Sequence, residues 1–266
     1  MNYFRLKPNQ QEGIDRTIET LCENRNGMLI QSSGIHCHAT GTGKTIIGLK
    51  IIDEVLKANR YNTKMTIMCF TERKHIIRDQ FNVENWGWWK NNNILDMKRI
   101  KFLEFVDTND SKWNEKIDRD YGKPKIVIIN RVFLTLKERY KKISKYYPDL
   151  IIHDECHSAI NNSSKEFLYY AKKEWKASII GFSATPIKLN RQYMVNEDEK
   201  DILSNIFGDG KEINIITNYN IIDVINDELI VPPRFNIIKL DSCDLKNDTY
   251  MYLDNKQTSI KKKIKY

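Results

Sequence analysis

HATGTGKT, residues 38–45, ends the apolar run GIHCHA and opens the helical pattern IIGLKIIDEVL. Glycines at 41 and 43 let the backbone curl so that its amides point inward, and the helix N-terminus behind them favours an anion. A strand, a glycine-rich turn and a helix in this order are typical of a phosphate-binding loop. The general pattern G-x-x-x-x-G-K-S/T has glycine where this chain has His38, and the alternative interpretation is a chance glycine-rich turn.

A phosphate-binding loop assigns a role to each of its polar residues. Lys44 would neutralise the β and γ phosphates of ATP, and the Thr45 hydroxyl would bind the Mg²⁺ ion that bridges them. The predicted nucleotide contacts of the loop are Thr40, Gly41, Thr42, Gly43, Lys44 and Thr45.

Four more apolar runs of strand length follow, separated by helical stretches. Near-continuous Ile and Val runs suit strands that are covered on both faces, although a buried helix can mimic any one of them. Their alternation with helices indicates a doubly wound domain, so we predict an α/β fold with a mostly parallel sheet and helices on both faces. The runs are MTIMCF at 65–70, KIVIIN at 125–130, LIIHD at 150–154 and SIIGFS at 178–183.

Two regions fit this rhythm less well. From 84 to 122 we expect a surface excursion, with a candidate strand in RIKFLEFV and a polar stretch around DTNDSKWNEK. Trp86, Trp88 and Trp89 in that region would either stack on bases or, as is more common for tryptophan, pack in a core. Near the end, YNIIDVINDELIVPPR predicts a short helix that stops at the proline pair 232–233.

The composition of the 266 residues favours one sizeable core and a polyanionic partner. Lys and Arg number 43 against 35 Asp and Glu, which gives a formal net charge of +8. The alternative is a lysine-rich solvated surface, and the KKKIK tail allows the same two interpretations.

The five cysteines form no C-x-x-C pair, so neither a disulfide framework nor a zinc module is indicated and a reducing compartment fits best. No apolar run approaches the roughly 18 residues that would span a membrane, and the opening lacks a signal peptide. We expect an intracellular soluble protein, in the cytoplasm, the nucleus or, for a virus, the viral factory or virion, with no membrane partner.

An acidic pair follows the third of these later strands, in DLIIHDECH at 149–157. Asp154 would hold Mg²⁺, and Glu155 would orient and deprotonate the water that attacks the γ phosphate. The alternatives are a structural acidic turn and a zinc site on His153 and His157. Zinc is disfavoured because that chemistry needs H-E-x-x-H on a helix.

The next strand ends in GFSATP at 181–186. The hydroxyls of Ser183 and Thr185 are placed to hydrogen-bond the acidic motif, whose last residue is His157, and to relay its state. These three residues are the predicted coupling group. Considered alone, Ser-Ala-Thr is equally an ordinary Ser/Thr loop.

HATGTGKT, DECH and SAT, in this order and each after a strand, resemble the nucleotide motifs of superfamily 2 DEAD/DEAH-like helicases. The resemblance is to the N-terminal RecA-like lobe of the branch that contains type III restriction subunits and excision-repair helicases. It implies a RecA-like P-loop NTPase domain over 1–235, with 236–266 a linker or the truncated start of a second lobe. FRLKPNQQEGID resembles the branch's L-R-P-x-Q segment, with Lys7 in place of Arg, and implies that Gln10 reads adenine; Phe4 would pack on the base. A plain amphipathic helix start is the alternative for this segment.

Two looser matches concern the nucleic acid. FTERKHIIRDQF and INRVFLTL resemble motifs that touch the nucleic-acid backbone in that family, and they imply phosphate contacts from Thr71, Arg73, Asn130 and Arg131. The alternative interpretation is that these residues only cap helices or lie on helix surfaces. The resemblance favours DNA over RNA.

The leading hypothesis is therefore an ATP-hydrolysing, nucleic-acid-dependent motor lobe that needs a second RecA-like lobe or a partner protein for full activity. In the family, the second lobe closes on ATP and supplies arginine fingers, which raise the rate by orders of magnitude. The first alternative is a stand-alone lobe that binds nucleotide or nucleic acid with little turnover. A kinase with the same loop is disfavoured because it gives no common reason for Gln10, DECH and SAT.

Overall fold

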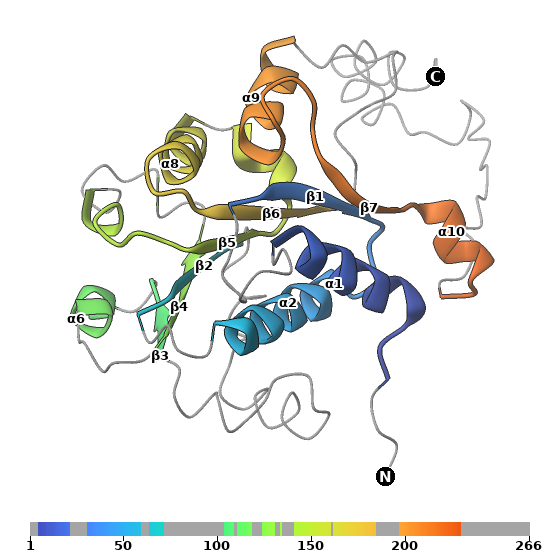
Figure 1. Cartoon of the computed structure of the whole chain (residues 1–266), viewed down its shortest axis with the longest axis horizontal. Helices are drawn as coiled ribbons and strands as arrows, with labels where there is room; N and C mark the ends of the chain where they lie inside the picture. The colour runs from blue at the N-terminus through green and yellow to red at the C-terminus, as the bar shows by residue number, and fades with distance from the viewer. Residues whose placement is uncertain are drawn as a thin grey trace, which may run out of the picture. The chain divides into compact units, whose positions relative to one another are not determined.

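Figure 1 shows the chain as a computed structural model, which describes residues 5–21, 31–59, 64–71, 104–108, 111–118, 124–130, 134, 141–160, 162–184 and 197–229. Its centre is a seven-stranded sheet in the order β3-β4-β2-β5-β6-β1-β7, and every pairing of neighbouring strands is parallel. The strands are β1 (Ser33–His38), β2 (Thr66–Thr71), β3 (Glu104–Asp107), β4 (Lys125–Asn130), β5 (Leu150–His153), β6 (Ser178–Ser183) and β7 (Ile215–Tyr219).

Helices cover both faces of this sheet, as Figure 1 shows. One face carries α1 (Pro8–Leu21) and α2 (Lys44–Ala58), and the other carries η2 (Cys156–Ile160), α8 (Asn162–Lys173) and α9 (Glu197–Phe207). Two short helices, α6 (Trp113–Asp118) and α10 (Ile221–Asn226), complete the described elements. The predicted α/β class is confirmed, and so are the five strands that the apolar runs predicted.

The interior strands are apolar at most positions because each of them faces two cores. In β2, Ile67 and Cys69 join the core beneath α1 and α2, whereas Met68 and Phe70 join the core beneath α8 and α9. Side chains alternate between the faces of a strand, so a continuous run of buried residues serves both layers. Polar residues are buried in these strands as well, and on β1 the side chains of His36 and His38 are fully buried.

Within residues 84–122, the candidate strand in RIKFLEFV is confirmed at its end as β3, whereas the expected surface excursion is wrong for α6, which is buried on one side. β3 is an edge strand paired with β4, and α6 lies beside it, with Trp113 and Ile117, 6% and 1% exposed, in the core beneath α8 and α9. Trp113 and Ile117 are four residues apart, which is the spacing of one helical face, but the residues before and between them are polar. Trp86, Trp88 and Trp89 lie outside the described residues.

The seventh strand, β7, was not predicted. Its polar Thr-Asn pair and its exposed first residue, Ile215 at 38% exposure, reflect an edge position with β1 on one side. The short helix after it is confirmed as α10, which begins with a capping box between Asn220 and Asp223. The proline stop and the boundary near residue 235 lie outside the described residues, so the domain division stays a prediction. None of the described helices combines the length and the apolar character needed to cross a membrane.

Candidate functional site

Three predicted motifs converge at one edge of the sheet because β1, β6 and β5 are neighbours. All strands run in the same direction, so the loop after β1, Ser183 at the end of β6 and Asp154 after β5 share the carboxyl edge. In the register of the sheet, Cys37 is level with Ser183, and His153 is level with Gly181. Ligands of open α/β sheets bind at this edge.

The loop after β1 has the backbone of an anion cradle. Gly41 and Gly43 both have φ 87°, a left-handed conformation that side chains disfavour, and Gly43 is the N-cap of α2. A Cβ atom at Gly43 would lie 2.4 Å from Nε2 of Gln10. Thr42 is fully buried and its hydroxyl donates to the Ala39 carbonyl at 2.9 Å, which closes the turn. Thr40, by contrast, is exposed.

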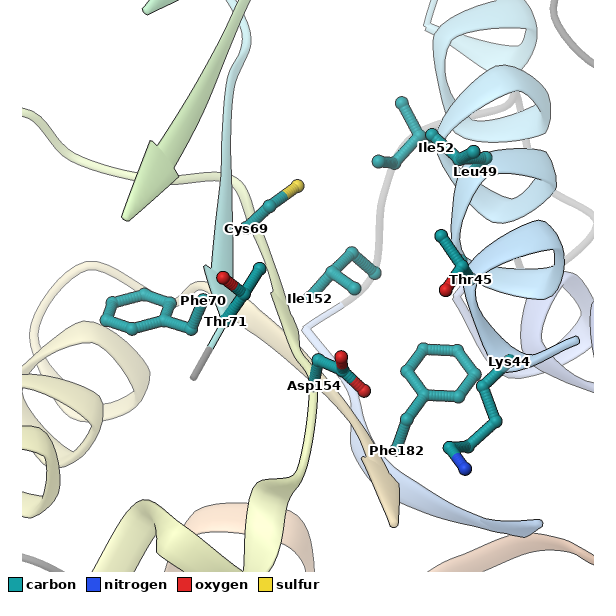
Figure 2. Close-up of a pocket in the computed structure, with 11 residues that line it drawn as sticks. Lys44, Thr45, Leu49, Ile52, Cys69, Phe70, Thr71, Ile152, Asp154 and Phe182 are labelled. Atoms are coloured by element: carbon teal, nitrogen blue, oxygen red, sulfur yellow. The ribbon is translucent and has the colours of Figure 1, made fainter. Parts of the chain in front are cut away.

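Lys44 and Thr45 begin α2 and face the end of β5. The Lys44 ammonium lies over the loop, 3.2 Å from the carbonyl oxygen of His38 and 3.5 Å from that of Ala39. Figure 2 shows the Asp154 carboxylate turned toward the side of the cavity where Thr45 and Lys44 lie, with the Phe182 ring beside it. The cavity is lined by Lys44, Thr45, Gly48, Leu49, Ile52, Cys69, Phe70, Thr71, Ile152, Asp154 and Phe182.

The acidic pair leaves the sheet through a strained turn. The Asp154 amide still donates to the Phe70 carbonyl at 2.9 Å, which continues the pairing of β5 with β2. Glu155 then adopts φ 48°, a left-handed conformation that is uncommon outside glycine, asparagine and aspartate. Its amide donates to Oδ1 of Asp154 at 3.1 Å, which ties the Asp154 carboxylate to the backbone of the turn. Strain of this kind gathers at functional sites.

His157 connects the acidic pair with β6. Its Nδ1 lies 3.3 Å from Oγ of Ser183 and 3.4 Å from Oε2 of Glu155. Two of the three predicted coupling residues therefore meet, while Thr185 lies outside the described residues. His153, the other member of the rejected zinc pair, is buried with its ring stacked on Phe70 at 5.4 Å between centroids.

Gln10 attaches α1 to the loop. Its side chain is 3% exposed, its Nε2 donates to the Thr42 carbonyl at 2.8 Å, and its Oε1 accepts from the Lys7 amide at 3.0 Å. Each end of the amide keeps capacity for one further hydrogen bond. Gln10 thus joins the start of α1 to the loop at Thr42. Phe4 lies outside the described residues.

The described nucleic-acid candidates lie side by side in the sheet. Thr71 ends β2, Asn130 ends β4, and the two are paired in register. They are 9% and 4% exposed, so in this conformation neither side chain offers much surface to a phosphate backbone. Arg73 and Arg131 lie outside the described residues, and the four contacts stay a prediction.

Sequence reasoning missed a buried polar group behind the loop. His36 Nε2 lies 2.7 Å from Oγ1 of Thr17 on α1, and His36 Nδ1 lies 2.6 Å from Oγ1 of Thr217 on β7. His38 Nε2 lies 2.6 Å from the same Thr217 oxygen. The signal in the sequence was His-x-His within a strand, which places both imidazoles on one face.

Both imidazoles are neutral at ordinary pH. Desolvation by burial, with a smaller contribution from the neighbouring His38, lowers the pKa of His36 to about 3. Desolvation, with a smaller contribution from the Lys44 ammonium, lowers the pKa of His38 to about 4. Neutral imidazole has one donor and one acceptor nitrogen, so each ring can join a directed chain of hydrogen bonds.

Comparison with protein families finds a match to a family described as "Type III restriction enzyme, res subunit", over residues 3–188. A search of curated protein sequences finds no match. Among solved structures, the chain is similar to the DEAD-box helicase Mss116 bound to ssRNA and UDP-BeF, with 16% identity and a TM-score of 0.53. It is also similar to a nuclease-deletion mutant of the Type ISP restriction-modification enzyme LlaGI in complex with a DNA substrate mimic, with 17% identity and a TM-score of 0.51.

These similarities cover 82% and 84% of this chain but only 41% of the Mss116 chain and 18% of the LlaGI chain. At this identity they establish the fold alone, which is the RecA-like domain of helicases. The predicted family resemblance is confirmed by the family match, which spans the loop at 38–45, the acidic pair and Ser183.

Proposed function

Because the chain belongs to the family of the type III restriction enzyme res subunit, we propose that it is an ATP-hydrolysing motor that acts on nucleic acid. It is the N-terminal lobe of a superfamily 2 helicase. The observation that carries the proposal is the cavity that Lys44, Thr45 and Asp154 line together. An ammonium, a hydroxyl and a carboxylate from two elements meet there at the carboxyl edge of the sheet.

The residues present fit ATP with Mg²⁺. Mg²⁺ prefers oxygen ligands, and the Thr45 hydroxyl and the Asp154 carboxylate supply two of them on opposite sides of the cavity. The loop backbone at Gly41 and Gly43, ahead of the N-terminus of α2, suits phosphate oxygens. When bound, Mg²⁺ would neutralise charge on the β and γ phosphates.

Each residue of the site then has a role in the proposed reaction. The Lys44 ammonium leaves the carbonyl oxygens of the loop and binds phosphate oxygens instead. This change is favoured because a hydrogen bond between two charged groups is stronger than one to a neutral carbonyl. Glu155, which follows Asp154 with a left-handed backbone, orients the attacking water and accepts its proton. Gln10 uses its remaining hydrogen-bonding capacity for the adenine edge while it stays attached to Thr42.

The coupling group would relay the state of the nucleotide to β6. His157 lies between a carboxylate oxygen of Glu155 and the Ser183 hydroxyl, so a change at the Glu155 carboxylate would alter the hydrogen bonds at the end of β6. Thr185, two residues farther along, is assigned to the same relay from the sequence. The nucleic-acid contacts proposed for Thr71, Arg73, Asn130 and Arg131 would lie after β2 and β4.

We favour DNA as the nucleic acid because the matching family is named for restriction enzymes. Full activity is proposed to need a second RecA-like lobe, in the same polypeptide or in a partner, because this chain corresponds to 41% of the Mss116 chain. Arginine side chains from such a lobe would stabilise charge on the transferring phosphoryl group.

The test is steady-state ATP hydrolysis with single-stranded and duplex DNA and RNA, together with equilibrium binding of Mg·ATP. We expect turnover that nucleic acid stimulates, with DNA the better activator. Lys44→Ala should lose both binding and turnover, whereas Glu155→Gln should bind but not hydrolyse. As a matched control, Lys50→Ala changes a lysine on the same helix that lies next to Asp53 instead of on the loop.

Binding without turnover in the presence of every nucleic acid would contradict hydrolysis by this chain alone. Addition of a second RecA-like lobe would then separate the two functions: it should restore turnover of a motor lobe and leave a stand-alone binding lobe inactive. Turnover that survives both Lys44→Ala and Glu155→Gln would show that the activity arises elsewhere.

A further inference from the structure

The buried polar group behind the loop is a directed chain of hydrogen bonds. The Thr17 hydroxyl donates to the Gly13 carbonyl at 2.8 Å, so it must accept from Nε2 of His36. Nδ1 of His36 is then an acceptor and takes the single proton of the Thr217 hydroxyl. Thr217 Oγ1 consequently accepts from Nε2 of His38. The reverse direction would sacrifice the bond to Gly13, because a hydroxyl donates only once.

A break in the register between β1 and β7 allows this series of hydrogen bonds to form. Ile35 pairs with Ile215, but His36 pairs with Thr217, so Ile216 is an extra residue in β7. Bulges are rare between parallel strands and re-aim the side chains that follow them. This one brings the Thr217 hydroxyl within hydrogen-bond distance of both imidazoles.

The chain of bonds ends at the first residue of the loop. The carbonyl oxygen of His38 lies 3.2 Å from the Lys44 ammonium, and the next amide, Ala39, donates to the Tyr219 carbonyl of β7 at 3.0 Å. The Ala39 carbonyl in turn accepts the Thr42 hydroxyl. β7 therefore holds the start of the loop twice, through the His38 side chain and through the Ala39 backbone.

We propose that His38 and Thr217 are positioning residues for nucleotide binding, which fix the loop to α1 and β7 through the series Thr17, His36, Thr217 and His38. The inference rests on the proposed function, because the loop is taken to bind the phosphates of ATP. α1 is thereby attached to the loop on two sides, at Gln10 through Thr42 and at Thr17 through the histidines. His38 stands where the general pattern has glycine, and its side chain supplies a support that glycine cannot.

Thr217→Val is the sharpest single change, because it keeps the shape of the side chain and removes one hydroxyl that joins two imidazoles. Thr217→Ser restores that hydroxyl. Thr108→Val is the matched control: Thr108 is 2% exposed, its hydroxyl donates to the Ile128 carbonyl at 2.9 Å, and it follows β3 at the opposite edge of the sheet. Both valine variants lose a buried hydroxyl, so a general loss of stability should affect them alike.

The experiment measures binding of Mg²⁺ with a fluorescent N-methylanthraniloyl-ATP to the full chain, and amide hydrogen exchange in residues 39–46 without nucleotide. We expect Thr217→Val to raise the Kd roughly tenfold and to speed exchange in the loop, because two hydrogen bonds are lost behind it. Thr217→Ser and Thr108→Val should stay within about twofold of the unmodified chain in Kd. If hydrolysis is measurable, KM should rise more than kcat falls.

Unchanged affinity and unchanged loop exchange in Thr217→Val would overturn the inference. If the unmodified chain binds no nucleotide, the proposed function fails, and loop exchange alone decides the positioning role: faster exchange in Thr217→Val than in Thr108→Val supports it, and equal exchange refutes it. Should Thr217→Val not fold, His38→Leu removes only the last bond of the series and is judged by the same two measurements.

Discussion

β2 and β1 are both interior strands of the same sheet, yet they are buried by different means. β2 carries Met68 and Phe70 toward one core and Ile67 and Cys69 toward the other, with apolar contacts on both faces. β1 presents Ile35 and Cys37 to one core but His36 and His38 to the other. Apolar packing is non-directional and tolerates replacement, whereas a buried imidazole must have a partner at a fixed angle. The strand that leads into the loop is the one with directional contacts.

Shortening an apolar side chain in the part of the sheet around β2 and β4 should cause the largest loss of stability. Ile128 on β4 is 3% exposed in the core beneath α1 and α2, so Ile128→Ala removes buried methyl groups and leaves a cavity. We expect a loss of about 2–5 kcal/mol in the free energy of unfolding. Urea denaturation measures this loss. A value below about 1 kcal/mol would contradict tight packing around Ile128.

Low pH should lower the free energy of unfolding through the two buried histidines of β1. Because the pKa of His36 is lowered to about 3 and that of His38 to about 4 in the folded chain, the unfolded chain, near 6.5, binds more protons below neutrality. Stability is therefore full above pH 6.5 and falls as pH drops, by up to about 1.4 kcal/mol per pH unit for each histidine. The loss continues toward pH 4 for His38 and pH 3 for His36.

Unfolding free energies between pH 6.5 and pH 5 test this slope, since most carboxylates titrate lower. His36 and His38 both contribute to the change of unfolding free energy with pH, so His36→Gln should remove the contribution of His36. A slope that the substitution leaves unchanged would show that other groups titrate in this window.

Gly43→Ala should affect the loop more than the sheet. The substitution places a Cβ at φ 87° and 2.4 Å from Nε2 of Gln10, so both the backbone and the attachment to α1 are strained. We expect a stability loss of roughly 1–3 kcal/mol, accompanied by weaker Mg·ATP binding. Gly208→Ala is unsuitable as a comparison because its Cβ would meet the Glu212 backbone at 1.7 Å. Normal affinity in Gly43→Ala would contradict the assigned loop geometry.

The exposed side of α1 should give the smallest effect. Glu12 and Arg16 form an ion pair at 2.7 Å with 53% and 57% of their side chains exposed. Such pairs contribute little in water, so Glu12→Gln should change the unfolding free energy by less than about 0.5 kcal/mol. Thermal unfolding of the variant tests this, and a larger change would mean that α1 depends on its outer face as well as on Gln10 and Thr17.

Sequence patterns predicted the framework well where the pattern is local. Five strands, the helix after the loop and the short helix α10 follow from runs of Ile and Val and from turn residues. β7 was missed because an edge strand with Thr217 and Asn218 lacks a continuous apolar run. α6 was missed because Trp113 and Ile117 are separated by polar residues and α6 is only six residues long.

The candidate site divides in the same way. The loop, Asp154, Glu155 and Ser183 could be named from the sequence because each follows a recognisable strand. His36 and Thr217 could not, because they are 181 residues apart and meet only through the bulge at Ile216.

By itself, then, the sequence determined which segments form strands and helices and which polar residues stand at the carboxyl edge of the sheet. These features depend on periodicity and on turn chemistry, which act over a few residues. Only the tertiary structure decided that Gln10 and Thr17 both support the loop and that His38 is joined to β7 through Thr217. Those contacts depend on sheet order and register, which no short stretch of the chain contains.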